Sequence, residues 1–462
     1  MSTDWQSANA IAEAVRAGRL RARAAVEAAL ERIDRGARRL NCFTAVLRDQ
    51  ARADAACIDA DIAAGRDPGP LAGVPFAVKN LFDVAGIVTL AGSKINRENA
   101  PAKQDAGVVR ALRRAGAVLV GTLNMDEYAY GFTTENAHYG PTRNPYDLSR
   151  SAGGSSGGSG AAVAAGLVPI SLGTDTGGSI RVPSALCGLF GLKPTFGRVT
   201  RTGTVLFAPS VDHVGPLARS VQDLVAVYDL LQGPDADDPA CSTRPADPAM
   251  PTLDDGIAGL RVALAGGYFL EHAESEVVAA ARCVAQALSA RREVTVPHAA
   301  AARAAAMIVT GVEGSGLHLA NLKTRPGDFD PMTRDRFIAA ALLPGSLYTR
   351  AQSFRRAYRL AVETLFADID ILVTPTTPLA APPIGQEQVT LGGSVFPSRA
   401  HVGRFTIPFS IIGLPVISVP VRGATPLPLG VQLVGAPFKE AQLLRAAAFL
   451  EAQRVVGFVP PS

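Results

Sequence analysis

A stretch rich in glycine and serine, residues 151–195, constrains this chain more than any other feature. Flexible linkers share that composition, but a linker is not followed at once by apolar secondary structure. Here residues 161–165 are typical of an apolar helix, residues 167–172 are typical of a buried strand, and a second glycine-rich turn follows. The stretch therefore belongs inside a folded domain, where glycine allows the backbone to approach a bound molecule closely.

Short apolar runs alternate with helical periodicity around this stretch. The runs VPFAVKN (74–80) and AVLVGTLN (117–124) predict buried strands, and residues 107–117 between them predict a helix that ends at Gly116. This alternation is typical of an α/β fold. We also expect strands within 259–266, 369–378, 414–421 and 428–437, and helices over 275–292, 332–368 and 440–454.

The two ends of the chain differ in character. Residues 8–64 carry apolar side chains at helical spacing, and the prolines at 68 and 70 then break the pattern. We therefore predict a helical segment over residues 1–65 and one catalytic α/β domain over residues 66–462. Proline and aspartate are frequent in residues 233–254, which we expect to form a loop.

Charge and cysteine content exclude several classes of partner. The net charge is only +4 over 462 residues, which gives no case for nucleic acid or a membrane surface. No run of 18 apolar residues exists, and the polar N-terminus does not predict a signal peptide. Five dispersed cysteines without a CxxC pair indicate reduced thiols and no zinc site, so we expect a cytoplasmic protein.

The second glycine-rich turn favours acyl-transfer chemistry. Thr176, Gly177, Gly178 and Ser179 can aim successive backbone N–H groups at one point, which is how an oxyanion hole stabilises a tetrahedral intermediate. A phosphate-binding loop is the alternative for such a turn, but the chain has no GxxxxGK[ST] match. We therefore interpret the turn as part of a serine hydrolase site.

A nucleophilic serine needs a base, and Lys79 is the strongest candidate. None of the six histidines lies in a recognisable triad motif such as GxSxG. Lys79 ends an apolar strand, where loss of solvation lowers the pKa of an ammonium group. Only six of the 45 basic residues are lysine, because the chain uses arginine almost everywhere. A lysine at this position is therefore notable, since lysine can lose its proton in a buried site and arginine cannot.

Three motifs in order are similar to those of the amidase-signature family. They are GVPFAVKN with Lys79, GGSSGGS with Ser155, and GTDTGGSIRVPS with Ser179, and the two serines stand 24 positions apart as in that family (179 − 155). The resemblance extends over nearly the whole chain and includes the segments TRNPYD, CGLFGLKPT and GVQLVGAPF. It implies a large mixed, twisted sheet covered by helices on both faces.

The resemblance also implies the roles of individual residues. Ser179 is expected as the nucleophile, Lys79 as the general base, and Ser155, held by a cis peptide bond, as the bridge between them. Asp175 and Arg181 are expected as supporting charges. The implied reaction cleaves a carbon–nitrogen amide bond and releases ammonia or an amine, with no metal or cofactor.

Two positions bear on the substrate. Within the family, residues 121–145 resemble the A subunits of glutamyl-tRNA(Gln) amidotransferase and the hydrolases that act on 1-carboxybiuret in cyanuric-acid (s-triazine) degradation. Arg355 falls where the amidotransferases hold the glutamine carboxylate, but Gly403 replaces the aspartate that would hold its ammonium group. Tyr128 and Tyr130 are candidate walls of the pocket. The pattern favours a small acidic amide without an ammonium group.

The favoured substrate is therefore a carboxylated urea derivative such as 1-carboxybiuret. The alternatives are the glutaminase component of a glutamyl-tRNA(Gln) amidotransferase, a broad amidase and a non-catalytic scaffold, the last disfavoured because Lys79, Ser155 and Ser179 are all present. The resemblance also implies a small helical partner subunit, with a heterotetramer among the assemblies it allows.

Overall fold

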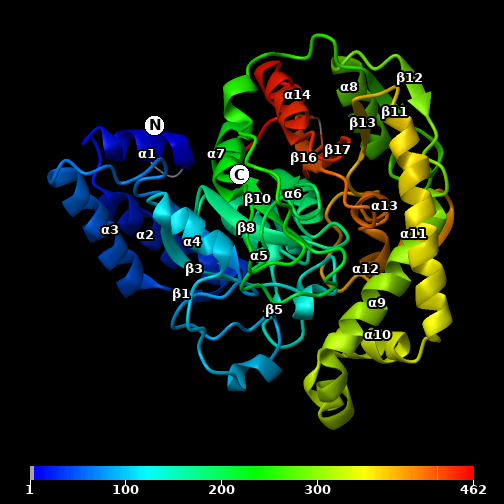
Figure 1. The fold of residues 1–462 in the computed structure, drawn as a ribbon, viewed down its shortest axis with the longest axis horizontal. Helices are drawn as coiled ribbons and strands as arrows, with labels where there is room; N and C mark the ends of the chain where they lie inside the picture. Colours follow the sequence, from blue (N-terminus) through cyan, green and yellow to red (C-terminus); the bar gives the residue numbers. More distant parts are fainter. Residues whose placement is uncertain (1–4, 424, 462) are drawn as a thin grey trace.

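An eleven-stranded mixed β-sheet is the main feature of the fold (Figure 1). The computed structural model describes residues 5–423 and 425–461. Strands β3, β2 and β8 run parallel, as do β13, β11 and β12, while antiparallel pairing joins the other neighbours. The expected α/β class with a large mixed sheet is confirmed. In sheet order the strands are β1 (Phe43–Val46), β3 (Val118–Leu123), β2 (Pro75–Lys79), β8 (Ile170–Asp175), β10 (His213–Ala218), β9 (Phe190–Lys193), β16 (Val416–Val421), β17 (Leu429–Val434), β13 (Ile371–Pro375), β11 (Val262–Ala265) and β12 (Arg292–Val294).

Helices cover the sheet on both faces. Helices α5 and α6 form one contacting pair, and α7 and α14 form another. Strands β9, β10 and β16 each contact one helix of the first pair and one helix of the second. The middle of the sheet is therefore enclosed between two helical layers. The helices are α1 (Ala8–Arg16), α2 (Ala22–Leu40), α3 (Arg48–Ala63), α4 (Gly107–Arg114), α5 (Gly157–Ala164), α6 (Arg181–Leu186), α7 (Val221–Leu231), α8 (Ser275–Ala287), α9 (Ala299–Thr324), α10 (Pro331–Ala341), α11 (Gly345–Leu365), α12 (Ser398–His401), α13 (Ile407–Ser410) and α14 (Glu440–Ala452).

Smaller hairpins lie outside the main sheet. Strands β4 (Glu135–Asn136) and β5 (Gly140–Pro141) pair with each other, as do β6 (Arg143–Asn144) and β7 (Asp147–Ser151), and β14 (Gln388–Leu391) with β15 (Ser394–Pro397). The first two hairpins occupy the chain between β3 and the first glycine-rich turn. The segment that leads into that turn is therefore held by two short hairpins.

The N-terminal segment is not entirely helical. Helix α2 ends at Leu40 because Asn41 adopts a left-handed conformation with φ of 53°, and the next residues form the edge strand β1 on β3. The prediction of helix throughout residues 8–64 was therefore wrong at these positions. Helix α3 then returns and packs against α2 and β3.

Three long helices form the opposite side of the molecule. Helix α9 contacts both α10 and α11, and the short helix α13 also packs on α9 (Figure 1). The buried apolar side chains of α9, α11 and α13 share a core with β13, β16 and β17, and the rings of Phe269, Phe405 and Phe409 pack together within it. The second half of the chain thereby supplies a wall that faces the glycine-rich turns of the first half.

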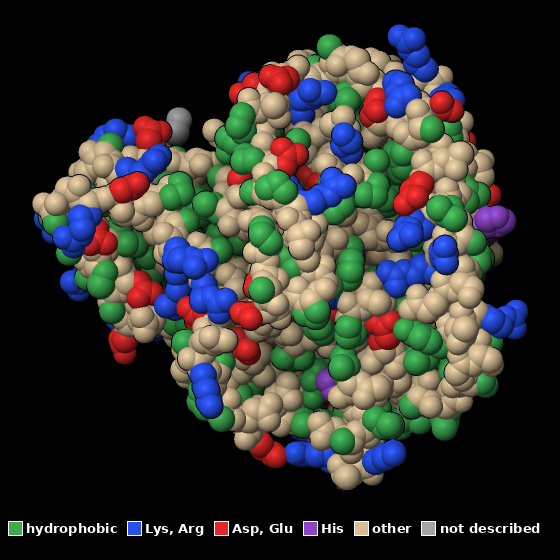
Figure 2. Space-filling model, viewed as in Figure 1, with side chains coloured by type: hydrophobic (Ala, Val, Ile, Leu, Met, Phe, Trp, Pro, Cys, Tyr) green, Lys and Arg blue, Asp and Glu red, His purple; other side chains and the backbone are tan. Residues whose placement is uncertain are grey.

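The surface shows no concentration of one charge on the face drawn in Figure 2, where basic and acidic side chains are interspersed. Within the described residues, no helix combines the length and apolar character that crossing a bilayer requires.

Candidate active site

Lys79 ends strand β2 and is fully buried between its neighbours β3 and β8. Its Nζ lies 2.8 Å from Ser155 Oγ and 2.8 Å from Thr174 Oγ1. Burial lowers the pKa of Lys79 to about 7, although the carboxylates of Asp126, Asp212 and Asp175 act in the opposite direction. Near neutral pH this amine is therefore partly unprotonated, the form in which it accepts a proton.

Ser155 lies in the first glycine-rich turn, two residues before helix α5. The peptide bond between Gly154 and Ser155 is cis, as the family resemblance implied. The backbone around it is closely packed, because a Cβ on Gly154 would collide with the Asp126 carboxylate, and the Asp126 N–H donates to the Ser155 carbonyl at 3.3 Å. The hydroxyl of Ser155 is thus fixed within reach of Lys79.

Ser179 lies in the second glycine-rich turn, between β8 and α6. Gly178 has φ of +145°, and a Cβ there would collide with Thr406, so only glycine fits. The two turns are joined by a hydrogen bond from the Ser156 N–H to the Ser179 carbonyl at 3.3 Å. This bond brings the segments that carry Ser155 and Ser179 together.

Backbone donors next to Ser179 are unused. In the part of the chain that the structure describes, the N–H groups of Gly177, Gly178 and Ser179 donate to no protein acceptor, whereas the next N–H, that of Ile180, donates to Asp175 at 3.2 Å. Unpaired N–H groups beside a serine are available to an oxygen atom of a bound molecule. Thr176 holds the turn from its other side, with its hydroxyl 2.5 Å from the Asp212 carboxylate.

Asp175 and Arg181 form a buried ion pair beneath the turn. The Arg181 Nε and Nη2 groups lie 2.9 Å from the two Asp175 carboxylate oxygens, and both side chains are inaccessible to solvent. Burial alone would raise the pKa of Asp175, but the Arg181 guanidinium outweighs it and holds that pKa below its ordinary value. Arg181 also donates to Gln432 and Thr406, so the pair ties the turn to β17 and α13.

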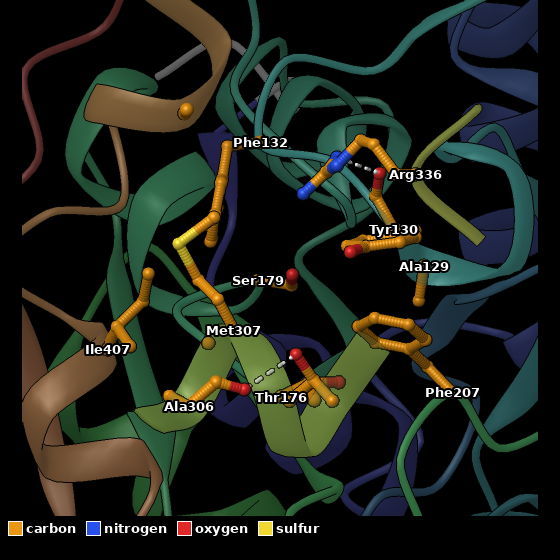
Figure 3. A pocket seen from close by; sticks show the side chains of 14 residues that line it. Ala129, Tyr130, Phe132, Thr176, Ser179, Phe207, Ala306, Met307, Arg336 and Ile407 are labelled. Carbon is orange, nitrogen blue, oxygen red and sulfur yellow. Dashed lines mark hydrogen bonds between the residues drawn. The ribbon is translucent and has the colours of Figure 1, made fainter. Parts of the chain in front are cut away.

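A pocket opens onto Ser179 (Figure 3). Its walls are mainly apolar, and they come from both halves of the chain. Arg336 is the one charged side chain among the residues that line it. The lining consists of Ala129, Tyr130, Gly131, Phe132, Thr176, Gly177, Ser179, Phe207, Ala306, Met307, Thr310, Arg336, Ala400 and Ile407.

The expected substrate contacts are only partly brought together. Tyr130 lines the pocket, but Tyr128 does not: its ring packs 3.8 Å from that of His318 in the core, centroid to centroid. Arg355 is also absent from the lining, and its Nη1 and Nη2 donate to the Ser210 hydroxyl at 3.0 Å and carbonyl at 2.7 Å. Helix α11, which carries Arg355, packs on α9, the helix that supplies part of the wall.

Sequence patterns missed several residues of this site. Phe132 and Thr174 carry no motif signal beyond their neighbours, and Arg336 is one arginine among many on α10 and α11. Gly403 lies directly behind Phe132, because a Cβ on Gly403 would stand 2.5 Å from the Phe132 Cζ atom. The aromatic ring therefore fills the space that a side chain at position 403 would need.

Acidic, histidine and cysteine side chains do not gather into a metal-binding group of three or more among the described residues. The polar groups that the two turns and β2 bring together are instead the Lys79 amine, the hydroxyls of Ser155 and Thr174 beside it, and backbone N–H groups. Such a set supports proton transfer and stabilisation of an oxyanion.

Comparison with known proteins agrees with this arrangement. The amidase family model matches residues 24–444. The chain is 52% identical to AtzE, part of the 1-carboxybiuret hydrolase of Pseudomonas sp. (strain ADP), over 96% of this chain and 97% of that protein. It is 42% identical to the A subunit of glutamyl-tRNA(Gln) amidotransferase from Anaeromyxobacter sp. (strain K), over 94% and 93% respectively.

Solved structures give the same result. A structure described as an s-triazine catabolic enzyme in a vestigial protein complex superposes with a TM-score of 0.97 at 50% identity, covering 98% of this chain and all of that one. The corresponding glutamyl-tRNA(Gln) amidotransferase protein of Thermotoga maritima gives a TM-score of 0.79 at 31% identity, with 95% and 94% covered.

Proposed function

The chain belongs to the amidase family and is an amidohydrolase, and from that premise we propose that it hydrolyses a small carboxylated urea derivative such as 1-carboxybiuret. The bond cleaved is an amide carbon–nitrogen bond, and ammonia is released. The triad of the proposed reaction is Lys79, Ser155 and Ser179. The 2.8 Å contact between Lys79 and Ser155 is the observation that carries the proposal.

The proposed first step forms an acyl-enzyme. Neutral Lys79 accepts the proton of Ser155, which in turn accepts the proton of Ser179. The Ser179 Oγ attacks the substrate carbonyl carbon, and the unused N–H groups of Gly177, Gly178 and Ser179 stabilise the oxygen that becomes negative. The carbon–nitrogen bond then breaks, and the proton held by Lys79 returns through Ser155 to the leaving nitrogen.

The second step regenerates the enzyme. Water attacks the acyl carbon and gives one proton to Lys79 through Ser155, and the Ser179 oxygen leaves and takes that proton back. The depressed pKa of Lys79, about 7, suits both directions, because the amine both accepts and donates near neutral pH.

The pocket supports an acidic substrate without an ammonium group. Its lining contains one arginine and no aspartate or glutamate. The Phe132 ring closes the space at Gly403, where an acid would be needed to hold the α-amino group of glutamine. High identity to part of a 1-carboxybiuret hydrolase over nearly the whole chain agrees with this choice.

Two assays test the reaction and its substrate. A fluorophosphonate should label the protein and fail to label the Ser179→Ala variant, whereas labelling that survives the substitution would remove Ser179 as nucleophile. Ammonia release should then be compared for 1-carboxybiuret, biuret, allophanate and glutamine. Efficient turnover of glutamine would favour the glutaminase component of an amidotransferase instead, and equal turnover of all four would favour a broad amidase.

We also propose that the chain works with a small helical partner subunit. The support is the similar s-triazine enzyme, whose structure is described as a protein complex, and the identity to one component of glutamyl-tRNA(Gln) amidotransferase. Mass measurement in solution, with the chain produced alone and together with its natural neighbours, tests the proposal. A lone chain that is stable and fully active would contradict it.

A further inference from the structure

Asp126 is buried shortly after strand β3, at the start of the short helical turn Glu127–Ala129. An aspartate at such a place ordinarily accepts a hydrogen bond from an N–H group of the turn that it begins. Among the described residues, the Asp126 side chain makes no such bond. Its carboxylate instead accepts hydrogen bonds from Thr134 and Arg399, which belong to other segments of the chain.

The Asp126 carboxylate fills the space between two glycines. A Cβ on Gly131 would stand 2.3 Å from the Asp126 Cγ atom, and a Cβ on Gly154 would stand 2.2 Å from its Oδ2 atom. Gly131 lines the pocket, and Gly154 directly precedes Ser155. The carboxylate is therefore packed between the pocket wall and the turn that carries Ser155.

Hydrogen bonds connect Asp126 with Ser155 by two routes. The Ser155 carbonyl accepts from the Asp126 N–H at 3.3 Å and from the Thr134 hydroxyl at 3.4 Å. The Thr134 N–H in turn donates to Asp126 Oδ2 at 3.0 Å. The backbone of Asp126 thus holds Ser155 directly, and its carboxylate fixes the second residue that does so.

Positive groups stabilise the charge of Asp126. Arg399 on helix α12 lies 3.2 Å from its Oδ1 atom, and the Asp126 side chain is only 3% exposed. Burial raises the pKa of Asp126 above its ordinary value, and the Asp330 carboxylate adds to that effect. Arg399, the Thr134 N–H group and Lys79 lower the same pKa. A negative charge that solvent hardly reaches therefore depends on its neighbours.

Lys79 responds to Asp126 more than to any other carboxylate. Burial lowers the pKa of Lys79 to about 7, and three carboxylates oppose that effect. Asp126 acts most strongly, followed by Asp212 and Asp175. A nearby negative charge favours the protonated amine, so it makes the neutral amine a stronger base.

We infer that Asp126 is a positioning residue, which holds the Ser155 turn against the pocket wall and keeps Lys79 basic enough to act near neutral pH. The inference rests on the proposed function, because Lys79 and Ser155 are the groups through which Asp126 acts. Asp126 itself exchanges no proton with the substrate.

The titration of Lys79 can be followed without any substrate. The chain has only six lysines, so lysine enriched in carbon-13 at Cε gives few NMR signals, and the one missing from Lys79→Met is that of Lys79. Its midpoint should lie at about pH 7 in the unmodified protein. In Asp126→Asn it should lie about one pH unit lower, because asparagine keeps an acceptor for Thr134 and removes the charge.

Two further variants separate this charge from other effects. Asp61→Asn breaks an aspartate–arginine pair with Arg66 on the surface near the end of helix α3, and it should leave the midpoint unchanged. Asp126→Asn combined with Arg399→Met leaves no unpaired arginine, and it should still show a midpoint below that of the unmodified protein. An unchanged midpoint in Asp126→Asn, or a return to the unmodified value in the double variant, would overturn the inference.

The rate of fluorophosphonate labelling at Ser179 measures the effect on the triad. In Asp126→Asn the pH of half-maximal rate should move toward acid together with the Lys79 signal, and the weaker base should lower the rate above that pH about threefold. Asp126→Ala also loses the bond to Thr134, so it should be slower than Asp126→Asn at every pH. An equal loss at every pH in Asp126→Asn, with no shift, would show a merely structural role and would also overturn the inference.

Failure of the proposed function has a different signature. An unmodified protein that is labelled but releases no ammonia from any acidic amide would remove the proposed substrate. The Lys79 titration and the labelling rates would still decide the role of Asp126.

Discussion

Replacing Lys79 by methionine should abolish hydrolysis and yet stabilise the fold near neutral pH. The ammonium group of Lys79 is fully buried, and its pKa falls from an ordinary 10.5 to about 7. At about 1.4 kcal/mol per pKa unit, keeping this lysine in the folded state costs about 4 kcal/mol at pH 7. Methionine has a similar length and no charge, so it removes that cost.

The lost hydrogen bonds offset part of the gain. Ser155 and Thr174 each lose a partner at 2.8 Å, which together costs about 2–3 kcal/mol. The expected net effect of Lys79→Met is a rise of about 1–2 kcal/mol in the free energy of unfolding at pH 7. Catalytic residues commonly carry such a stability cost.

The pH dependence of this difference is the sharper test. Between pH 7 and 10.5 the unfolded chain keeps the Lys79 proton and the folded chain has lost it, so the stability of the unmodified protein rises with pH. From pH 7 to 9 that rise is about 2 kcal/mol, and Lys79→Met lacks it. The advantage of the methionine variant should therefore shrink or reverse by pH 9.

Urea unfolding followed by circular dichroism at pH 7 and 9 gives both values. Contributions from groups remote from Lys79 are the same in the two proteins and cancel in the difference. Lys103→Met makes the same exchange at an exposed position and is the control for loss of a lysine side chain. A pH-independent difference for Lys79→Met would refute the depressed pKa, and with it the argument that Lys79 is the base.

Three further outcomes are expected. The kcat/KM for an uncharged amide should rise about tenfold between pH 6 and 8, because Lys79 with a pKa of about 7 must be neutral to accept a proton, and a flat profile in ammonia release would contradict this. Gly403→Ala should lower the free energy of unfolding by about 1–3 kcal/mol through overlap with the Phe132 ring. Phe132→Ala should lower the free energy of unfolding by less in the Gly403→Ala variant than in the unmodified protein. Strictly additive losses in urea unfolding would exclude the overlap. Arg181→Met should lower the free energy of unfolding by about 3–5 kcal/mol, because it leaves the Asp175 carboxylate buried without its cation. In urea unfolding, a loss below about 1 kcal/mol would show that other groups compensate the carboxylate.

Local patterns were sufficient for much of the sheet. Strands β2 and β3 lie within the apolar runs predicted around Phe76 and Leu119, and β16 and β17 lie within the runs predicted near the C-terminus. Each of these strands is buried on both faces, so nearly every residue in it is apolar and the run stands out. Strand β1 escaped prediction because four residues at a sheet edge carry little pattern between two long helices.

The parts of the site that depend on tertiary packing were not predictable. Lys79 and Ser155 stand in recognisable motifs, but the 2.8 Å contact between their side chains comes from the fold. Arg336 and Arg355 belong to neighbouring helices rich in arginine, and only the packing of α10 and α11 on α9 decides which of them reaches the pocket. Phe132 and Gly403 touch across 271 positions (403 − 132), so neither residue predicts the other.

The order of strands in the sheet has a consequence for synthesis of the chain. Strands β16 and β17 lie between β9 and β13, so two strands that come late in the described chain lie inside the sheet and not at its edge. During translation, the half that ends with β9 and the half that contains β11 to β13 cannot join across the sheet until about residue 434 has emerged. A nascent chain that already contains Lys79, Ser155 and Ser179 therefore still lacks the central strands that unite the two halves.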